Sequence, residues 1–141
     1  MIRCVIVEDE EMARKVLKSL LAQYCQDVMV CAEADDIVSG KNMIETFRPD
    51  LVFLDIEMPG ASGLEIAMMI KKQHKNCLII FLTSHINYAV DGYELEIFRF
   101  VPKSDIETRL ERTISDATKI IDFDSKESYL VQKHDLVGKV K

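Results

Sequence analysis

Short apolar runs recur along the chain, and each is followed at once by polar residues. The run from Leu51 to Leu54 has no alternation of apolar and polar positions, which indicates a strand covered on both faces, as in a parallel sheet. Charged Arg99 lies inside the last run and suits a strand at the edge of the sheet. Five strands are therefore predicted, over residues 2–7, 28–34, 51–54, 78–82 and 97–101.

The segments between these strands place apolar residues at helical spacing. Asp35 and Asp36 offer an N-cap to a helix that stops before Pro49, and Ser104 with Glu107 matches a capping box. Five strands alternating with five helices predict a doubly wound α/β fold, a parallel sheet with helices on both faces. Helices are expected from about residue 10 to 24, from 37 to 47, from 63 to 72, from 88 to 93 and from 104 to 121.

Residues 122–141 break this alternation. Residues 128–133 and 136–141 look like two strands around a turn, and a lone hairpin is marginal in water. Either it packs on the body or it begins a second domain, and we favour the second interpretation. We therefore expect one domain over residues 1–121, followed over 122–141 by a linker and the first hairpin of a truncated further domain.

Composition narrows the class of protein. A chain of 141 residues that is 48% hydrophobic is long enough for one domain with a real core. It has no run of about 18 uncharged apolar residues and no signal peptide, so we expect an intracellular, cytoplasmic protein without a membrane segment. The four cysteines show no metal-ligand spacing, and Cys4 and Cys31 look like small core residues. The net charge of −6 falls on residues 1–121, which argues against nucleic-acid binding by the body.

Every candidate reactive group directly follows a strand: Glu8 and Asp9, Asp55, Thr83 and Lys103. If the strand order is the flavodoxin-like 2-1-3-4-5, the first and third strands are neighbours, and Asp9 comes to lie against Asp55. Carboxylates so close repel one another unless a cation or protons join them. Carboxylates with a main-chain carbonyl suit Mg²⁺, which commonly bridges to a phosphate.

These carboxylates, the lysine and the hydroxyl are the groups that phosphoryl transfer needs. That reaction requires in-line positioning of the reactants and cations around the phosphoryl oxygens. Asp55 would be the nucleophile and would form an aspartyl phosphate. Mg²⁺ and Lys103 would neutralise the oxygens, and the Thr83 hydroxyl would donate one hydrogen bond. Taken singly, Thr83 reads as a strand-end cap and Lys103 as a solvated loop lysine.

The motifs V-E-D-E, L-D-I-E-M-P-G, L-T-S and F-V-P-K resemble the receiver domain of two-component response regulators, over about residues 1–121. The resemblance implies that Asp55 is the phosphoacceptor. It further implies that Asp9, Asp55 and the Glu57 backbone carbonyl bind Mg²⁺, with Glu8 supporting through water.

The same resemblance makes Thr83 and Phe100 a switch pair, although Phe100 on spacing alone reads as core. Glu57 and His85 occupy positions that tune how long the phosphate survives, although His85 alone would be a surface histidine. A sensor histidine kinase would donate the phosphoryl group. Phosphorylation would reshape the face built by the predicted helix over residues 88–93, the strand over 97–101 and the helix over 104–121, to control homodimerisation. Such a protein is not an enzyme beyond its own phosphorylation and dephosphorylation.

The segment Phe81 to His85, with Tyr88 and Ala89 and the strand-like tail, looks like the subclass whose output is a LytTR-type DNA-binding domain. DNA would then be bound only through an output domain that this chain lacks. One departure from the family concerns Lys103, which is usually followed by a cis proline. Here Ser104 follows, and because a cis bond without proline costs about 2.5 to 4 kcal/mol, we predict a trans peptide, an altered loop and an uncertain reach for Lys103.

Three rival classes stay open. A haloacid-dehalogenase-like phosphatase also uses an Asp nucleophile and Mg²⁺, but its D-x-D motif follows the first strand, whereas Asp55-Ile56-Glu57 follows the third. A flavodoxin-like flavin binder needs a Gly- and hydroxyl-rich loop after the first strand, where this chain has acids. The third is a receiver-like protein-binding module that is never phosphorylated.

Overall fold

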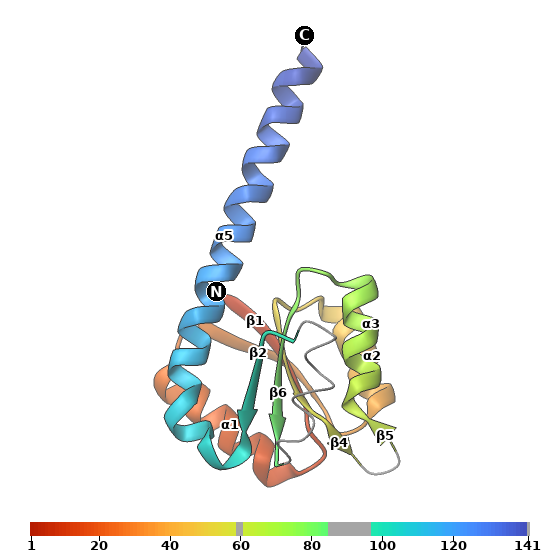
Figure 1. Ribbon diagram of the computed structural model, residues 1–141, viewed down its shortest axis with the longest axis vertical. Coiled ribbons are helices and arrows are strands. Elements are labelled where there is room, and N and C mark those ends of the chain that lie inside the picture. Colours follow the sequence, from red (N-terminus) through yellow and green to blue (C-terminus); the bar gives the residue numbers. More distant parts are fainter. Residues whose placement is uncertain (59–60, 85–96, 141) are drawn as a thin grey trace.

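The structure, a computed structural model, describes residues 1–58, 61–84 and 97–140, with side chains as far as residue 123 except that of Ala61. Its centre is a parallel sheet flanked by helices, and a long C-terminal helix extends away from the sheet (Figure 1). None of the helices in these described ranges is long and apolar enough to cross a membrane.

Within the described residues, five strands form the sheet in the order β2-β1-β3-β6-β7, and every neighbouring pair is parallel. This order confirms the predicted flavodoxin-like doubly wound fold, with the first and third strands of the sequence side by side. Edge strand β7 contains exposed Arg99, as expected. The strands are β1 (Ile2–Val7), β2 (Val28–Ala34), β3 (Leu51–Asp55), β6 (Leu78–Thr83) and β7 (Arg99–Pro102).

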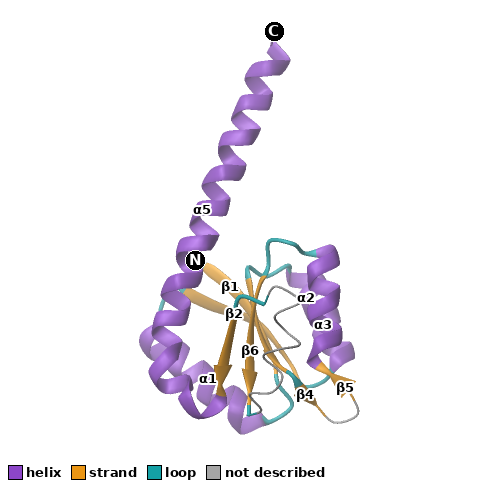
Figure 2. Ribbon diagram, in the orientation of Figure 1, coloured by secondary structure: helices purple, strands orange, loops and turns teal. Residues whose placement is uncertain are grey.

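Helices cover both faces of the sheet (Figure 2). On one face α1 (Glu11–Tyr24) and α5 (Ile106–Val140) pack on a core that includes Ile6 and Phe53. On the other face α2 (Ile37–Phe47) and α3 (Gly63–Gln73) pack on a core that includes Val5 and Val52. Successive strand residues thus contribute to opposite cores, which explains why the central strands β1, β3 and β6 are mostly apolar and lack an alternation of apolar and polar positions.

Of the two predicted helix caps, one is confirmed and one is wrong. Asp36 is the N-cap of α2, where its side chain accepts a hydrogen bond from the Ser39 amide at 2.7 Å. Ser104, in contrast, does not cap α5, because it lies inside the 3₁₀ turn η1 (Lys103–Asp105). Tight turns of this kind are common at helix N-termini, and here the turn moves the start of the α-helix to Ile106.

The prediction of a hairpin over residues 128–141 is also wrong, because α5 continues without interruption to Val140 (Figure 1). The strand preference of short apolar runs depends on packing against neighbouring strands. Extending an existing helix, in contrast, needs no new nucleus, and no proline follows Pro102 in the sequence. The division of the chain near residue 121 into two domains stays a prediction.

The burial of the cysteines corrects a further expectation. All four are free, and Cys4, Cys25 and Cys77 are buried, but Cys31 is only half-buried. The register of β1 against β2 shifts at this point, with Cys4 opposite Val30 and the next residue opposite Ala32. Cys31 is therefore the extra residue of a bulge on an edge strand, which removes it from the core.

Candidate functional site

The predicted reactive residues meet at one edge of the sheet, where the parallel strands end. Asp55 is the last residue of β3 and Thr83 the last of β6, while Glu8 directly follows β1 and Lys103 directly follows β7. Glu8, Asp55 and Thr83 are 2%, 4% and 3% exposed. Two carboxylates that are this buried need a compensating positive charge.

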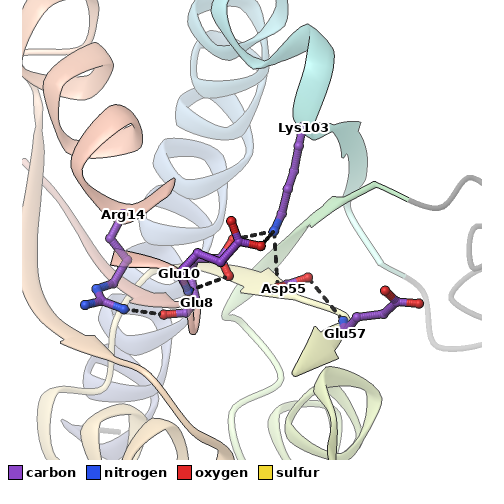
Figure 3. A network of polar contacts seen from close by, with 6 residues as sticks. All are labelled: Glu8, Glu10, Arg14, Asp55, Glu57 and Lys103. Carbon is purple, nitrogen blue, oxygen red and sulfur yellow. Dashed lines mark hydrogen bonds and ion pairs between the residues drawn. The ribbon is translucent and has the colours of Figure 1, made fainter. Parts of the chain in front are cut away.

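Lys103 supplies that charge, and its ammonium group lies between the carboxylates (Figure 3). Its Nζ is 2.6 Å from Oε1 of Glu8, 3.2 Å from Oδ2 of Asp55 and 3.9 Å from Oε1 of exposed Glu10. The peptide bond after Lys103 is trans, as predicted, and the side chain reaches Asp55 from the 3₁₀ turn. The doubt about its reach is therefore resolved in favour of contact.

A group of three acids could hold a metal ion at this edge. Glu8, Asp9 and Asp55 each offer a carboxylate oxygen, and these oxygens lie within 4.8 Å of one another. Oδ1 of Asp9 is buried and has no hydrogen-bond partner among the described residues. A buried oxygen without a donor, beside two further carboxylates and a single lysine, matches the all-oxygen environment that Mg²⁺ prefers.

The polypeptide beyond Asp55 is tied back to that residue. The Glu57 amide donates a hydrogen bond of 3.1 Å to Oδ1 of Asp55, while the Glu57 side chain is exposed (Figure 3). Glu57 is the first residue of β4 (Glu57–Met58), which pairs antiparallel with β5 (Ala61–Ser62). This hydrogen bond from the Glu57 amide orients the Asp55 carboxylate and leaves the other carboxylate oxygen, Oδ2, for Lys103.

The environment shifts the pKa values of all three charged groups. Burial, with the neighbouring Asp55 and Asp9 carboxyls, raises the pKa of Glu8 to about 7 despite Lys103. Burial likewise raises the pKa of Asp55, although Glu8 and Lys103 oppose that rise. Burial lowers the pKa of Lys103, but its contacts with Glu8 and Asp55 outweigh this effect, so its pKa is raised overall. Excess negative charge is thus concentrated where a cation would relieve it.

Gly63 is a site residue that the sequence analysis missed. Its amide donates a hydrogen bond of 2.8 Å to the Ile56 carbonyl, which docks the start of α3 against the end of β3. A Cβ atom at this position would lie 2.2 Å from the backbone carbonyl oxygen of Asp55. Only glycine permits this approach. The sequence signal was a glycine eight residues after the acid, which is ambiguous without knowledge of the fold.

The predicted switch residues occupy neighbouring strands. Thr83 ends β6 opposite Pro102, and Phe100 of β7 lies opposite Phe81. The rings of Phe81 and Phe100 have centroids 5.3 Å apart and are tilted by 42°, so Phe100 packs against the core in this conformation. Its role as a switch stays a prediction. His85 and the predicted helix over residues 88–93 lie outside the described residues.

Comparison with known proteins identifies the family. The response regulator receiver domain family matches residues 4–115. The chain belongs to this family. It is therefore the receiver domain of a two-component response regulator, as the motifs predicted.

Curated relatives include two kinds of regulator. The receiver domain is 37% identical over 115 residues to the transcriptional regulatory protein BtsR of Escherichia coli K12, which covers 82% of this chain and 47% of BtsR. It is 32% identical over 138 residues to the sensory transduction protein LytT of Bacillus cereus, which covers 98% of this chain and 54% of LytT. The chain thus spans about half the length of these relatives, and the likeness to LytT agrees with the predicted subclass.

A solved structure supports the fold independently. The response regulatory domain of the protein mrkE from Klebsiella pneumoniae is 28% identical and superposes with a TM-score of 0.78, covering 85% of this chain and 98% of that one. The receiver fold therefore accounts for the sheet and its helices, and α5 continues past residue 115, where the match to the receiver domain family ends.

Proposed function

We propose that this receiver domain accepts a phosphoryl group from a sensor histidine kinase onto Asp55. The observation that carries the proposal is the contact of 3.2 Å between Lys103 Nζ and Asp55 Oδ2, beside a three-carboxylate cluster at the strand ends. A lysine and a cation site around one carboxylate are what transfer of a phosphoryl group to that carboxylate requires.

In the proposed reaction an Asp55 oxygen forms a bond to phosphorus while the bond from phosphorus to the donor histidine nitrogen breaks. The imidazole keeps the electron pair of that bond and takes up a proton. Asp55 must be ionised to attack, and burial alone would favour its protonated form. The contact with Lys103 opposes protonation and so favours the charged form of the nucleophile.

Mg²⁺ would be held by Asp9, Asp55 and the Glu57 carbonyl, with Glu8 contributing through water. When bound, the cation supplies neutralisation of charge on the phosphoryl oxygens. The ion pair of 2.6 Å between Glu8 and Lys103 already engages one Glu8 oxygen, which suits a supporting role for Glu8. The Glu57 side chain is exposed beside this site. Glu57 and His85 would tune how long the phosphate survives.

The donor would approach over an apolar hollow next to Lys103. This hollow has a volume of about 270 Å³ and is lined by residues that include Met12, Val16, Leu82 and Ile106. Met12 and Val16 are 69% and 44% exposed on α1, so a partner helix could bury apolar surface there without disturbing the core. The partner would thereby bring its phosphohistidine to the acidic edge of the sheet.

The output is a change on the face that includes β7 and α5. The Thr83 hydroxyl would donate to the phosphoryl group, and Phe100 would turn inward behind it, altering the surface near the Arg99–Asp116 ion pair. Homodimerisation through this face would follow phosphorylation. LytT and BtsR are about twice as long as this chain. We therefore propose that the receiver controls a LytTR-type output domain that binds DNA, and that the regulator is cytoplasmic.

The test is incubation with a small-molecule phosphodonor and Mg²⁺, followed by intact mass measurement. We expect the mass gain of one phosphoryl group in the wild type and none in Asp55→Asn. Asp50→Asn is the matched control, because Asp50 precedes the same strand at its opposite end and holds the Arg3 amide at 3.0 Å through a contact that asparagine retains. It should gain mass like the wild type.

Two results would reject the proposal in favour of its alternatives. Absence of a mass gain in both the wild type and Asp50→Asn, with a phosphodonor and with beryllofluoride, would favour the binding module that is never phosphorylated. Rapid consumption of many equivalents of donor, abolished in Asp55→Asn, would favour the phosphatase.

A further inference from the structure

Arg14 connects the acidic edge to a part of the sheet that takes no direct part in the proposed chemistry. Its Nη1 donates a hydrogen bond of 2.7 Å to the backbone carbonyl of Glu8 (Figure 3). Its Nε lies 3.4 Å from Oε1 of Glu33 on β2, and its side chain is 18% exposed. The guanidinium group therefore joins helix α1, strand β2 and the turn that carries the acids.

The Glu8 carbonyl has a special position, because it belongs to the peptide unit that joins Glu8 to Asp9. That unit is planar, so a bond that fixes its oxygen also fixes the direction in which the chain enters Asp9. On the other side of Glu8, its amide donates to the Ala34 carbonyl at 3.0 Å. The turn is thus held at both ends of Glu8, and both bonds are to partners outside the carboxylate cluster.

The guanidinium group is suited to this arrangement. Arginine presents several donors in a fixed plane and can bond to two acceptors in different directions at once. Glu33 is itself held from the other side by Lys18, whose Nζ lies 2.9 Å from Oε2 of Glu33. The orientation of the Arg14 side chain is therefore set by ion pairs with Glu33 on β2, and Glu33 is in turn held by Lys18.

We infer that Arg14 is a positioning residue for the cation site: it holds the Glu8–Asp9 peptide in the orientation that turns both carboxylates toward Asp55. This inference rests on the proposed function. It assigns Arg14 no contact with the cation or with the phosphoryl group.

The test is a Mg²⁺ titration of the full chain, followed by amide NMR, with thermal unfolding measured without metal in parallel. Arg14→Met should weaken Mg²⁺ binding about tenfold, as is typical when a residue that orients a metal ligand is removed. Arg14→Lys should lose about threefold, because an ammonium group can still reach the carbonyl but lacks the planar fork. Lys18→Met is the matched control: it removes one ion pair of Glu33, leaves the Glu8 carbonyl bonded, and should bind Mg²⁺ within about twofold of the wild type.

The two measurements separate positioning from general stability. A lower unfolding temperature for Arg14→Met with unchanged Mg²⁺ affinity well below that temperature would overturn the inference, as would equal weakening in Arg14→Met and Lys18→Met. If Arg14→Met does not fold, Arg14→Lys decides by the same criteria. A wild-type chain that binds no Mg²⁺ would reject the proposed cation site itself, which is a different result from a wild type that binds and a variant that binds equally well.

Discussion

Replacement of Gly63 by alanine tests how rigidly the acidic edge is built. In the structure an added Cβ would lie 2.2 Å from the Asp55 carbonyl oxygen and 3.1 Å from the Ile56 Cα, and both are backbone atoms. A side chain could rotate away from such a contact, but backbone cannot. Relief therefore requires the start of α3 to move away from the end of β3 by about 1 Å, since real Cβ contacts stay above 3.0 Å.

The cost follows from two contributions. Inserting a methyl group into a packed position typically costs about 1–3 kcal/mol, and a contact with unyielding backbone belongs at the upper end. Separation of the segments also weakens the bond of 2.8 Å between the Gly63 amide and the Ile56 carbonyl, which contributes about 1 kcal/mol. The better helix propensity of alanine offsets part of this loss. We expect a net loss of about 3 kcal/mol in the free energy of unfolding.

Urea denaturation measures this loss. For an m-value near 2 kcal/mol/M, the unfolding midpoint of Gly63→Ala should fall by about 1.5 M with the slope unchanged. Gly40→Ala is the matched control in α2. Its Cβ would meet the Ile66 Cδ1 at 2.8 Å and Val7 methyl groups at 3.0 and 3.2 Å, which are side-chain ends that can adjust. Its midpoint should therefore shift by no more than about 0.5 M in either direction. Equal midpoints for Gly63→Ala and the wild type would refute the argument that the approach of α3 to Asp55 is fixed.

Three further predictions concern charge and thiol chemistry. Because the pKa of Glu8 is raised to about 7, the metal-free fold loses stability from this group as pH rises from about 4.5 through 7, and Mg²⁺ affinity, measured by titration, should rise over the same interval; a flat profile between pH 5 and 8 would contradict this. Cys31 should be the one cysteine that iodoacetamide alkylates in the folded protein, as read by peptide mass mapping, because the other three are buried. Asp116→Asn, which removes the partner of Arg99, should lower the free energy of unfolding by less than about 1 kcal/mol in urea, because the pair is partly exposed.

The site could be predicted from the sequence to the extent that its residues follow strands. Asp55, Thr83 and Lys103 each come directly after or at the end of an apolar run, and the topology of a parallel sheet places such ends together. The contact between Lys103 and Asp55 follows from that rule. The departure from the usual lysine–proline sequence did not prevent it, because the lysine side chain is long and flexible enough to cross from the turn.

The features that could not be predicted depend on distances across the fold. Gly63 and Arg14 act through backbone carbonyls of Asp55 and Glu8, and no pattern of side-chain types reports which carbonyl a residue will meet. The exposure of Cys31 depends on a register shift between two strands, which hydrophobicity does not encode. Residues 128–140 are helical although their sequence pattern is strand-like, because extension of the helix already formed upstream competes with strand pairing.

The 3₁₀ turn after β7 connects Lys103 directly to the C-terminal helix. Lys103 is the first residue of that three-residue turn, and α5 begins immediately after it. No slack loop separates the ammonium group from the 35-residue helix. A movement of the Lys103 backbone toward or away from Asp55 would therefore also move the first turn of α5, because only the other two residues of the 3₁₀ turn lie between them.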